Sequence, residues 1–230
     1  ANFGDFVIER SPKARHLINL VGIESPGITA SMPIAKMVLD ILAEDTELKE
    51  KPDSSKLVFG KCMTDHMLII DFDEGQGWHD ARIVPFGNLS IHPASTVLHY
   101  GSEIFEGLKA YRNAEGGVQM FRPMENIRRM NRSAERMGLP ALPEEDTLQA
   151  LHELIKLEAD WVPHGEGTSM YIRPFMIGDD EQLGVHGIGR AHFIIILSPS
   201  GSYYAGGMAP VKIMIEDEDV RAVRGGTGYA

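Results

Sequence analysis

A β-hairpin that runs directly into an amphipathic helix constrains the fold of this chain more than any other feature of its sequence. Two strand-like runs, residues 109–112 and 118–122, flank the turn-forming segment 113–117. Pro123 follows at a position typical of the first turn of a helix, and Gly138 marks the end of that helix. The apolar stripe between them consists of Met124, Ile127, Met130, Ala134 and Met137. Strand and helix signals in such close succession predict a mixed fold of the α/β (α+β) class.

Further strands and one more helix are predicted around this unit. Residues 57–59 and 67–72 are strand-like. Apolar residues at helical spacing predict a second helix over residues 147–161. Residues 170–175 form another predicted strand, and the uniformly apolar run 192–197 predicts a strand that is buried on both faces.

The composition excludes several functional classes. With 230 residues, 43% hydrophobic and 24% charged, the chain can bury one or two ordinary cores. The formal net charge of -11 argues against nucleic-acid binding as a main activity. Cys62 is the only cysteine, which excludes a disulfide framework and favours a reducing, cytoplasmic setting. We expect no membrane partner, because no apolar run approaches the ~18 residues of a membrane helix, and no metal site, because no HExxH motif is present.

The first 45 residues carry a pattern of their own. Residues 17–23 are typical of a buried strand, 25–31 of a turn, and 33–41 of a helix. The helix start suits an anionic oxygen, but the pattern also fits an ordinary β–α connection with a serine cap. As a whole, the run 19–31 resembles the C-terminal end of FAD-dependent 2-hydroxyacid or amine oxidoreductases. No G-x-G-x-x-G motif is present to grip the ADP half of FAD, so we expect no complete flavin site.

From residue 56 onward the chain resembles a different family. The motifs that carry this resemblance are LHYGSEIFEG at 98–107, FRP at 121–123 followed by Arg129, YIRP at 171–174 and GGTG at 225–228. In this order they resemble the branched-chain amino acid aminotransferases of fold-type IV, which use pyridoxal 5'-phosphate (PLP). The resemblance implies the small domain of a D-amino acid aminotransferase-like fold and the start of its large domain.

The two resemblances divide the chain into four predicted parts. These are a flavoprotein-like segment at 1–45, a charged linker at 46–55, an aminotransferase small domain at 56–200, and an interdomain loop with the start of a large domain at 201–230. Within the last part, residues 211–215 are predicted to start a new sheet. In the resembling family the Schiff-base lysine would follow the GGTGxx stretch at position 231, beyond Ala230. We therefore expect no catalytic residue within this chain and no activity of the chain alone.

Arg129 is the predicted cofactor-binding residue. Arg128, Arg132 and Arg136 share one helix face and are typical of a solvated surface, whereas Arg129 lies about 100° away, beside the apolar stripe. The pattern alone leaves open whether Arg129 is a surface or a functional residue. In the resembling family, the arginine eight positions after the hairpin phenylalanine, here Phe121, holds the cofactor phosphate. A guanidinium group matches a phosphate in charge and in hydrogen-bonding geometry.

Aromatic residues and a glycine form the predicted substrate pocket. Tyr100, Phe105 and Tyr171 could be ordinary core aromatics, but a glycine such as Gly107 beside them often marks a close approach of backbone to a ligand. The resemblance implies that Tyr100, Phe105 and Tyr171, together with Phe59, wall a pocket for the side chains of leucine, isoleucine and valine.

Arg173 has two possible roles. A strand arginine followed by proline could form an ion pair with Glu106 or Asp179. A branched-chain aminotransferase must, however, also take glutamate in the same pocket, and a cation beside an apolar wall would bind the second carboxylate. The resemblance implies this second role for Arg173, with the hydroxyl of Tyr100 as its partner.

The resemblance implies a transferase that moves amino groups from branched-chain L-amino acids to 2-oxoglutarate, with PLP as cofactor. Its partners would be small-molecule substrates and a second copy of the chain in a homodimer. Three alternatives remain open: another class IV PLP enzyme such as a D-amino acid aminotransferase, an FAD-dependent oxidoreductase, and a non-catalytic interaction protein. Flavin absorbance of the purified chain would test the second of these.

Overall fold

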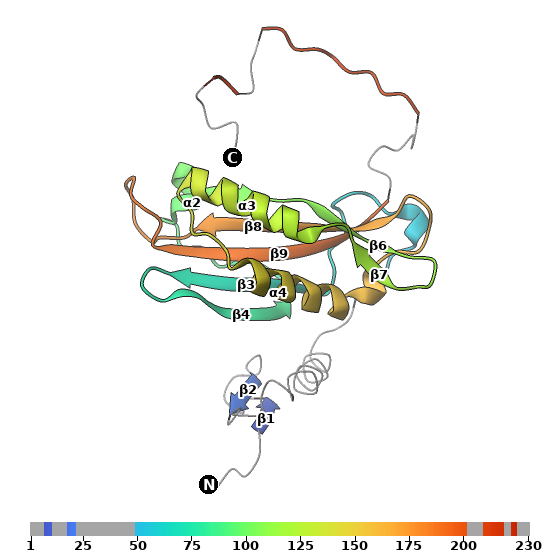
Figure 1. The fold of residues 1–230 in the computed structure, drawn as a ribbon, viewed down its shortest axis with the longest axis horizontal. Coiled ribbons are helices and arrows are strands. Elements are labelled where there is room, and N and C mark those ends of the chain that lie inside the picture. Colours follow the sequence, from blue (N-terminus) through green and yellow to red (C-terminus); the bar gives the residue numbers. More distant parts are fainter. Residues whose placement is uncertain (1–6, 11–17, 22–48, 202–208, 219–221, 225–230) are drawn as a thin grey trace. The chain divides into compact units, whose positions relative to one another are not determined.

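The computed structural model describes residues 7–10, 18–21, 49–201, 209–218 and 222–224 (Figure 1). The chain divides into two units, Ala1–Glu50 and Lys51–Ala230. In the first unit, β1 (Val7–Arg10) pairs antiparallel with β2 (Ile18–Val21). The strand predicted over 17–23 is thus present as β2, whereas the predicted turn and helix after it lie outside the described residues.

The second unit is built on a seven-stranded sheet in which every described pairing is antiparallel. Its strands are β3 (His66–Asp73), β4 (Gly77–Pro85), β5 (Glu103–Phe105), β6 (Leu108–Arg112), β7 (Val118–Met120), β8 (Ser169–Gly178) and β9 (Arg190–Ser200). The strand order is β4-β3-β9-β8-β6-β7, and β5 pairs with β8 beside β6. The long strands β8 and β9 form the centre of the sheet, in the middle of the view in Figure 1.

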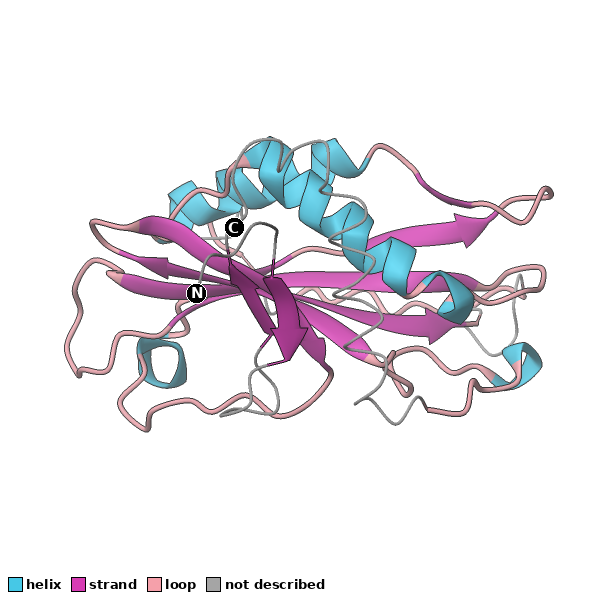
Figure 2. Ribbon diagram, turned by 90° about the horizontal axis from the view of Figure 1, so that it is seen from below, coloured by secondary structure: helices cyan, strands magenta, loops and turns pink. Residues whose placement is uncertain are grey.

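Two helices cover one face of this sheet. Helices α3 (Pro123–Met137) and α4 (Glu144–Leu157) lie together on the same side, as Figure 2 shows. Between them and the sheet lies the main hydrophobic core, in which Met130 and Leu154 pack with Ile172 and Phe193. The opposite face carries a smaller apolar cluster around Ile194. Among the helices that the structure describes, none is long and apolar enough to cross a membrane.

Strands β5 and β6 lie end to end along one edge of β8. Phe105 of β5 is paired with Phe175, and Leu108 of β6 is paired with Ile172. Both pairs belong to one continuous register, so β5 and β6 are two halves of a single interrupted strand. Exposed and buried residues alternate strictly from 103 to 111. Because side chains of a strand point alternately to its two faces, every second residue faces the helices and every other one faces the opposite side.

The structure confirms the hairpin and the helix that follows it. Strands β6 and β7 form the hairpin, and α3 begins at Pro123 and ends before Gly138, whose φ of 69° suits a glycine cap. The strands predicted at 67–72, 170–175 and 192–197 are present as parts of β3, β8 and β9. The mixed α and β fold predicted from these signals is therefore correct.

Other predictions were wrong or incomplete. Residues 57–59 form no strand, because the chain turns there: the Lys61 N–H donates to the carbonyl of Val58, and Gly60 has a φ of 69°. The second helix begins at Glu144 rather than at 147 and ends at Leu157, after which a short 3-10 turn follows. Residues 211–215, predicted to start a new sheet, contain no strand. Strand β4 and the short helix α2 (Thr96–Tyr100) were not predicted.

Candidate active site

Among the predicted pocket residues, Tyr171 of β8 contacts two others, Arg173 and Phe59. Its hydroxyl accepts a hydrogen bond from Arg173 Nη2 at 2.7 Å. Its ring meets the ring of Phe59 edge to face, with 4.8 Å between the ring centroids. Tyr171 and Arg173 are two residues apart on one strand, so the pleat places both side chains on the sheet face opposite α3 and α4. Three of the predicted pocket residues therefore form one contact group.

Gly107 also contacts this group, because Tyr171 occupies the space that a side chain at position 107 would need. A Cβ atom placed on Gly107 would lie 2.5 Å from the hydroxyl oxygen of Tyr171 and 3.2 Å from the ring carbon that bears it. No side chain larger than hydrogen fits without displacing the tyrosine. In the register of β5 and β6 on β8, Gly107 lies opposite Arg173, which explains why the tyrosine ring can lean across this position.

Arg173 combines a charged head with an aromatic support. Its guanidinium carbon lies 4.2 Å from the centroid of the Phe105 ring, within the range of a cation–π contact. Phe105 itself is 63% exposed, so this pair faces outward rather than into the core. The Nε of Arg173 is buried and has no hydrogen-bond partner among the described residues. An arginine with a buried, unsatisfied donor beside an aromatic wall is suited to receive an anionic ligand.

The alternative ion pairs proposed for Arg173 are not formed. The carboxylate of Glu106 is bound by Arg129 instead. Asp179 accepts a hydrogen bond from His192 at 2.9 Å, so its contacts also lie elsewhere.

The described contacts of Tyr100 do not include the Tyr171 group. It is the last residue of α2, and its hydroxyl accepts a hydrogen bond from the Gly184 N–H at 2.6 Å. The predicted contact between the Tyr100 hydroxyl and Arg173 is not among the contacts of either residue. The pocket role of Tyr100 therefore stays a prediction.

Arg129 of α3 makes a two-point ion pair with Glu106. Arg129 Nε donates to Glu106 Oε1 at 2.5 Å, and Nη2 donates to Oε2 at 2.7 Å. The arginine side chain is 59% exposed, whereas Glu106 is only 6% exposed. Arg128, its neighbour, instead pairs with Glu125 and Glu144 on the helix surface. Both arginines are exposed, so the structure distinguishes them by their partners and not by burial.

The electrostatics of this pair keep both groups charged. Burial raises the pKa of the Glu106 carboxyl, but hydrogen bonds from Arg129, Asn126 and the Gly107 N–H together outweigh it, and the pKa lies below its ordinary value. The hydrogen bond to Glu106 and the charge of that carboxylate raise the pKa of Arg129. Arg129 is therefore a permanent cation whose Nη1 has no partner among the described residues.

Sequence reasoning placed Glu106 only as a possible partner of Arg173. The signal for its actual position was present in the alternation of residues 103–111, where Glu106 shares the buried phase with Ile104, Leu108 and Ala110. A carboxylate in the core phase of a strand requires a cationic partner, because an unpaired buried charge is costly.

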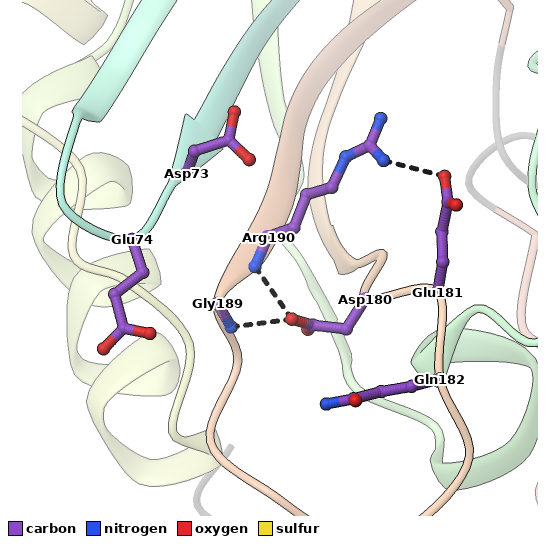
Figure 3. Close-up of a pocket in the computed structure, with 7 residues that line it drawn as sticks. All are labelled: Asp73, Glu74, Asp180, Glu181, Gln182, Gly189 and Arg190. Atoms are coloured by element: carbon purple, nitrogen blue, oxygen red, sulfur yellow. Dashed lines mark hydrogen bonds and ion pairs between the residues drawn. The ribbon is translucent and has the colours of Figure 1, made fainter.

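A pocket of about 400 Å³ lies away from these residues, between the end of β3 and the loop that joins β8 to β9 (Figure 3). Asp180 Oδ1 accepts hydrogen bonds from the N–H groups of Gly189 and Arg190 at 3.0 and 3.1 Å, and Arg190 pairs with Glu181 at 2.8 Å. These contacts hold the two ends of the loop between β8 and β9 together. None of the predicted site residues lines this pocket.

Known proteins show close similarity in sequence. The chain is 54% identical over 183 residues to branched-chain-amino-acid transaminase 1 of Bacillus subtilis, a match that covers 79% of this chain and 51% of that protein. It is 47% identical over 189 residues to the cytosolic branched-chain-amino-acid aminotransferase of Rattus norvegicus, covering 82% of this chain and 46% of that protein. The chain spans about half the length of the curated relatives it matches. No family model matches the sequence.

Solved structures show a more distant likeness. The branched-chain aminotransferase of Thermoproteus uzoniensis with norvaline is 27% identical, with a TM-score of 0.48, over 61% of this chain and 43% of that chain. At the level of sequence, about four fifths of this chain is similar to branched-chain-amino-acid aminotransferases.

Proposed function

We propose that this chain forms the cofactor-binding and substrate-binding part of a PLP-dependent aminotransferase for leucine, isoleucine and valine, with 2-oxoglutarate as amino acceptor. The observation that carries the proposal is a continuous series of contacts. Arg129 binds Glu106, and the next residue, Gly107, lies against Tyr171. Tyr171 in turn accepts a hydrogen bond from Arg173. A phosphate-binding candidate and a substrate-binding candidate are thereby joined through the two consecutive residues between β5 and β6.

The residues present fit the phosphate end of PLP. The Arg129 guanidinium is exposed and permanently charged. Its Nη1 has no partner among the described residues, so it can donate to an anion. An arginine offers a phosphate a geometrically matched hydrogen bond as well as a charge. PLP, when bound, supplies the electron sink that allows the proton on the α-carbon of an amino acid to leave.

The residues around Tyr171 would select the amino acid side chain. The rings of Phe59, Phe105 and Tyr171 present an apolar surface suited to branched aliphatic groups. Arg173 would hold the second carboxylate of glutamate or 2-oxoglutarate through its guanidinium group, whose Nε lacks a partner. One pocket could in this way accept both an apolar and an acidic substrate, with Tyr100 as a further wall.

Substrate preference tests the role of Arg173 in the complete enzyme. Arg173→Leu should lower kcat/KM for glutamate much more than for leucine, because only glutamate brings a charge that would be left unpaired. Loss of one partner of such a pair costs ~3–5 kcal/mol, or about two to four orders of magnitude in relative kcat/KM. Tyr111→Leu, which replaces an exposed aromatic on the same face of the sheet, is a matched control. An equal loss for both substrates would show that Arg173 is only structural.

Binding of the cofactor tests the role of Arg129. Arg129→Ala should weaken binding of PLP by about one to two orders of magnitude, since each lost charged hydrogen bond is worth ~1.5–3 kcal/mol. Arg128→Ala, one residue away and paired on the helix surface, should leave binding nearly unchanged. Equal effects of the two substitutions would contradict the proposed site.

The proposal also includes a homodimer in the cytoplasm and a junction near residue 46 between a flavoprotein-like segment and the aminotransferase. The division of the chain into the units Ala1–Glu50 and Lys51–Ala230 supports the junction. Deletion of residues 1–45 should leave cofactor binding intact, and the purified chain should carry no stoichiometric FAD. A yellow protein, or a deletion variant that no longer folds, would contradict the junction.

A further inference from the structure

Glu106 is a buried carboxylate at the break between β5 and β6. It lies in the phase of the strand that faces the helices, and its backbone N–H donates to the carbonyl of Pro174 on β8 at 2.9 Å. Four donors surround its carboxylate. They are Arg129 Nε at 2.5 Å, Arg129 Nη2 at 2.7 Å, Asn126 Nδ2 at 3.1 Å and the Gly107 N–H at 3.2 Å. Such a set of donors fixes the position of both carboxylate oxygens.

The carboxylate in turn fixes the arginine. A free arginine side chain samples many rotamers, and ordering it costs conformational entropy. Here two of the three guanidinium nitrogens of Arg129 are bound by an acceptor that is itself held by Asn126 and by backbone. The plane of the guanidinium is therefore set before any ligand arrives. Nη1 is left as the nitrogen without a partner among the described residues, on a side chain that is 59% exposed.

We infer that Glu106 is a positioning residue that orients Arg129 so that Nη1 is presented to the phosphate group of the cofactor. This inference rests on the proposed function, in which Arg129 binds that phosphate. Glu106 does not itself touch the ligand, because two anions would repel each other. It acts through Arg129, to which both of its carboxylate oxygens are bound.

Glu106 also has an effect on Arg129 that opposes the proposed one, and the two effects predict opposite changes in phosphate binding. A carboxylate beside Arg129 also cancels part of its charge, which by itself weakens attraction for a phosphate. If this effect dominated, Glu106→Gln would strengthen binding of the phosphate. If orientation dominates, Glu106→Gln weakens it, although the site becomes more positive. The sign of the change separates the two.

The binding experiment uses the 230-residue chain with two probes, pyridoxamine 5'-phosphate and pyridoxamine, by isothermal titration calorimetry. The ratio of the two affinities isolates the contribution of the phosphate. We expect Glu106→Gln and Glu106→Asp to lower this ratio by about 10-fold to 100-fold, the worth of one charged hydrogen bond. Glu106→Asp keeps the charge but shortens the side chain. Glu103→Gln removes the same charge from an exposed position of β5 and should leave the ratio unchanged.

A second measurement follows the arginine without any ligand. In ¹⁵N NMR spectra, the Nε–Hε group of Arg129 should give a separate, slowly exchanging signal in the wild-type chain and in Glu103→Gln. It should merge with the signals of exposed arginines in Glu106→Gln. Far-UV circular dichroism of each variant reports whether it is folded, and Glu106→Asp provides a second variant should Glu106→Gln fail to fold.

The outcomes distinguish the inference from the function on which it rests. A wild-type chain that binds both probes equally would refute phosphate binding by this site, and the inference with it. A wild-type chain that prefers the phosphorylated probe, with a preference that is unchanged or increased in Glu106→Gln, would overturn the inference alone. A lowered ratio together with a lost Nε–Hε signal would support it.

Discussion

Replacement of Gly107 by alanine tests how closely Gly107 packs against Tyr171 in the candidate site. Gly107 does not have a positive φ, so an alanine is compatible with its backbone. The added Cβ would, however, lie 2.5 Å from the hydroxyl oxygen of Tyr171. Non-bonded heavy atoms normally stay about 3.5 Å apart, so the added Cβ and the hydroxyl oxygen of Tyr171 must separate by about 1 Å. The tyrosine is the group that must move, and its hydrogen bond to Arg173 would be disrupted.

The net effect on stability is a difference between two terms. Gly→Ala at a compatible backbone position stabilises by ~0.4–1 kcal/mol, because the unfolded chain has fewer states to lose. Overpacking at a filled site costs ~1–3 kcal/mol. We therefore expect Gly107→Ala to lower the free energy of unfolding by about 0.5–2 kcal/mol in the wild-type background.

A double-mutant cycle identifies the crowded atom. Tyr171→Phe removes only the hydroxyl, after which the nearest atom to the new Cβ is a ring carbon at 3.2 Å. In that background Gly107→Ala should be neutral or slightly stabilising, within about 0.5 kcal/mol of zero. Urea unfolding followed by far-UV circular dichroism gives all four free energies. An equal cost of Gly107→Ala in both backgrounds would refute the idea that the hydroxyl occupies the space of the missing side chain.

Three further expectations concern stability. Gly178→Ala should lower the free energy of unfolding by ~1–3 kcal/mol, measured in urea, because its Cβ would lie 2.8 Å from Ser102 Oγ in a buried strand end. Glu158→Ala should cost a similar ~1–3 kcal/mol by the same assay, since it removes a buried hydrogen bond to His66. The pKa of Glu106 is lower in the folded than in the unfolded chain, so its contribution is complete above the ordinary glutamate pKa and is lost as the pH falls through the folded value. Below about pH 4.5, stability of the wild-type chain should therefore fall more steeply with pH than that of Glu106→Gln.

Local signals in the sequence were sufficient for α3 but not for α4. Pro123 and Gly138 act within one turn of the helix ends, and both ends are where these residues predict them. The start of α4 was missed by three residues although its signal was present. Three acidic residues, 144–146, occupy the first turn, where they compensate the positive end of the helix dipole. The apolar stripe alone marks where a helix packs, not where it begins.

Strand pairing explains the larger differences between prediction and structure. Residues 57–59 are apolar enough for a strand, but a strand also needs a neighbour, and the turn at Gly60 directs the chain elsewhere. β4 shows the reverse case. Its sequence contains charged residues at its centre, yet it forms a strand because it lies at the edge of the sheet beside β3. The first outcome follows from a local turn, and the second from the hairpin that pairs β4 with β3.

The candidate site depends on pairing in the same way, and Pro174 determines where it forms. In an antiparallel ladder, residues of a hydrogen-bonded pair exchange two hydrogen bonds. Glu106 donates its N–H to the Pro174 carbonyl, but proline has no N–H to return. The ladder is therefore interrupted at this pair, between β5 and β6, where Glu106 binds Arg129 and Gly107 contacts Tyr171. The proline of the YIRP motif thus contributes through a missing hydrogen bond, an effect that becomes visible only once the register of β5 and β6 on β8 is known.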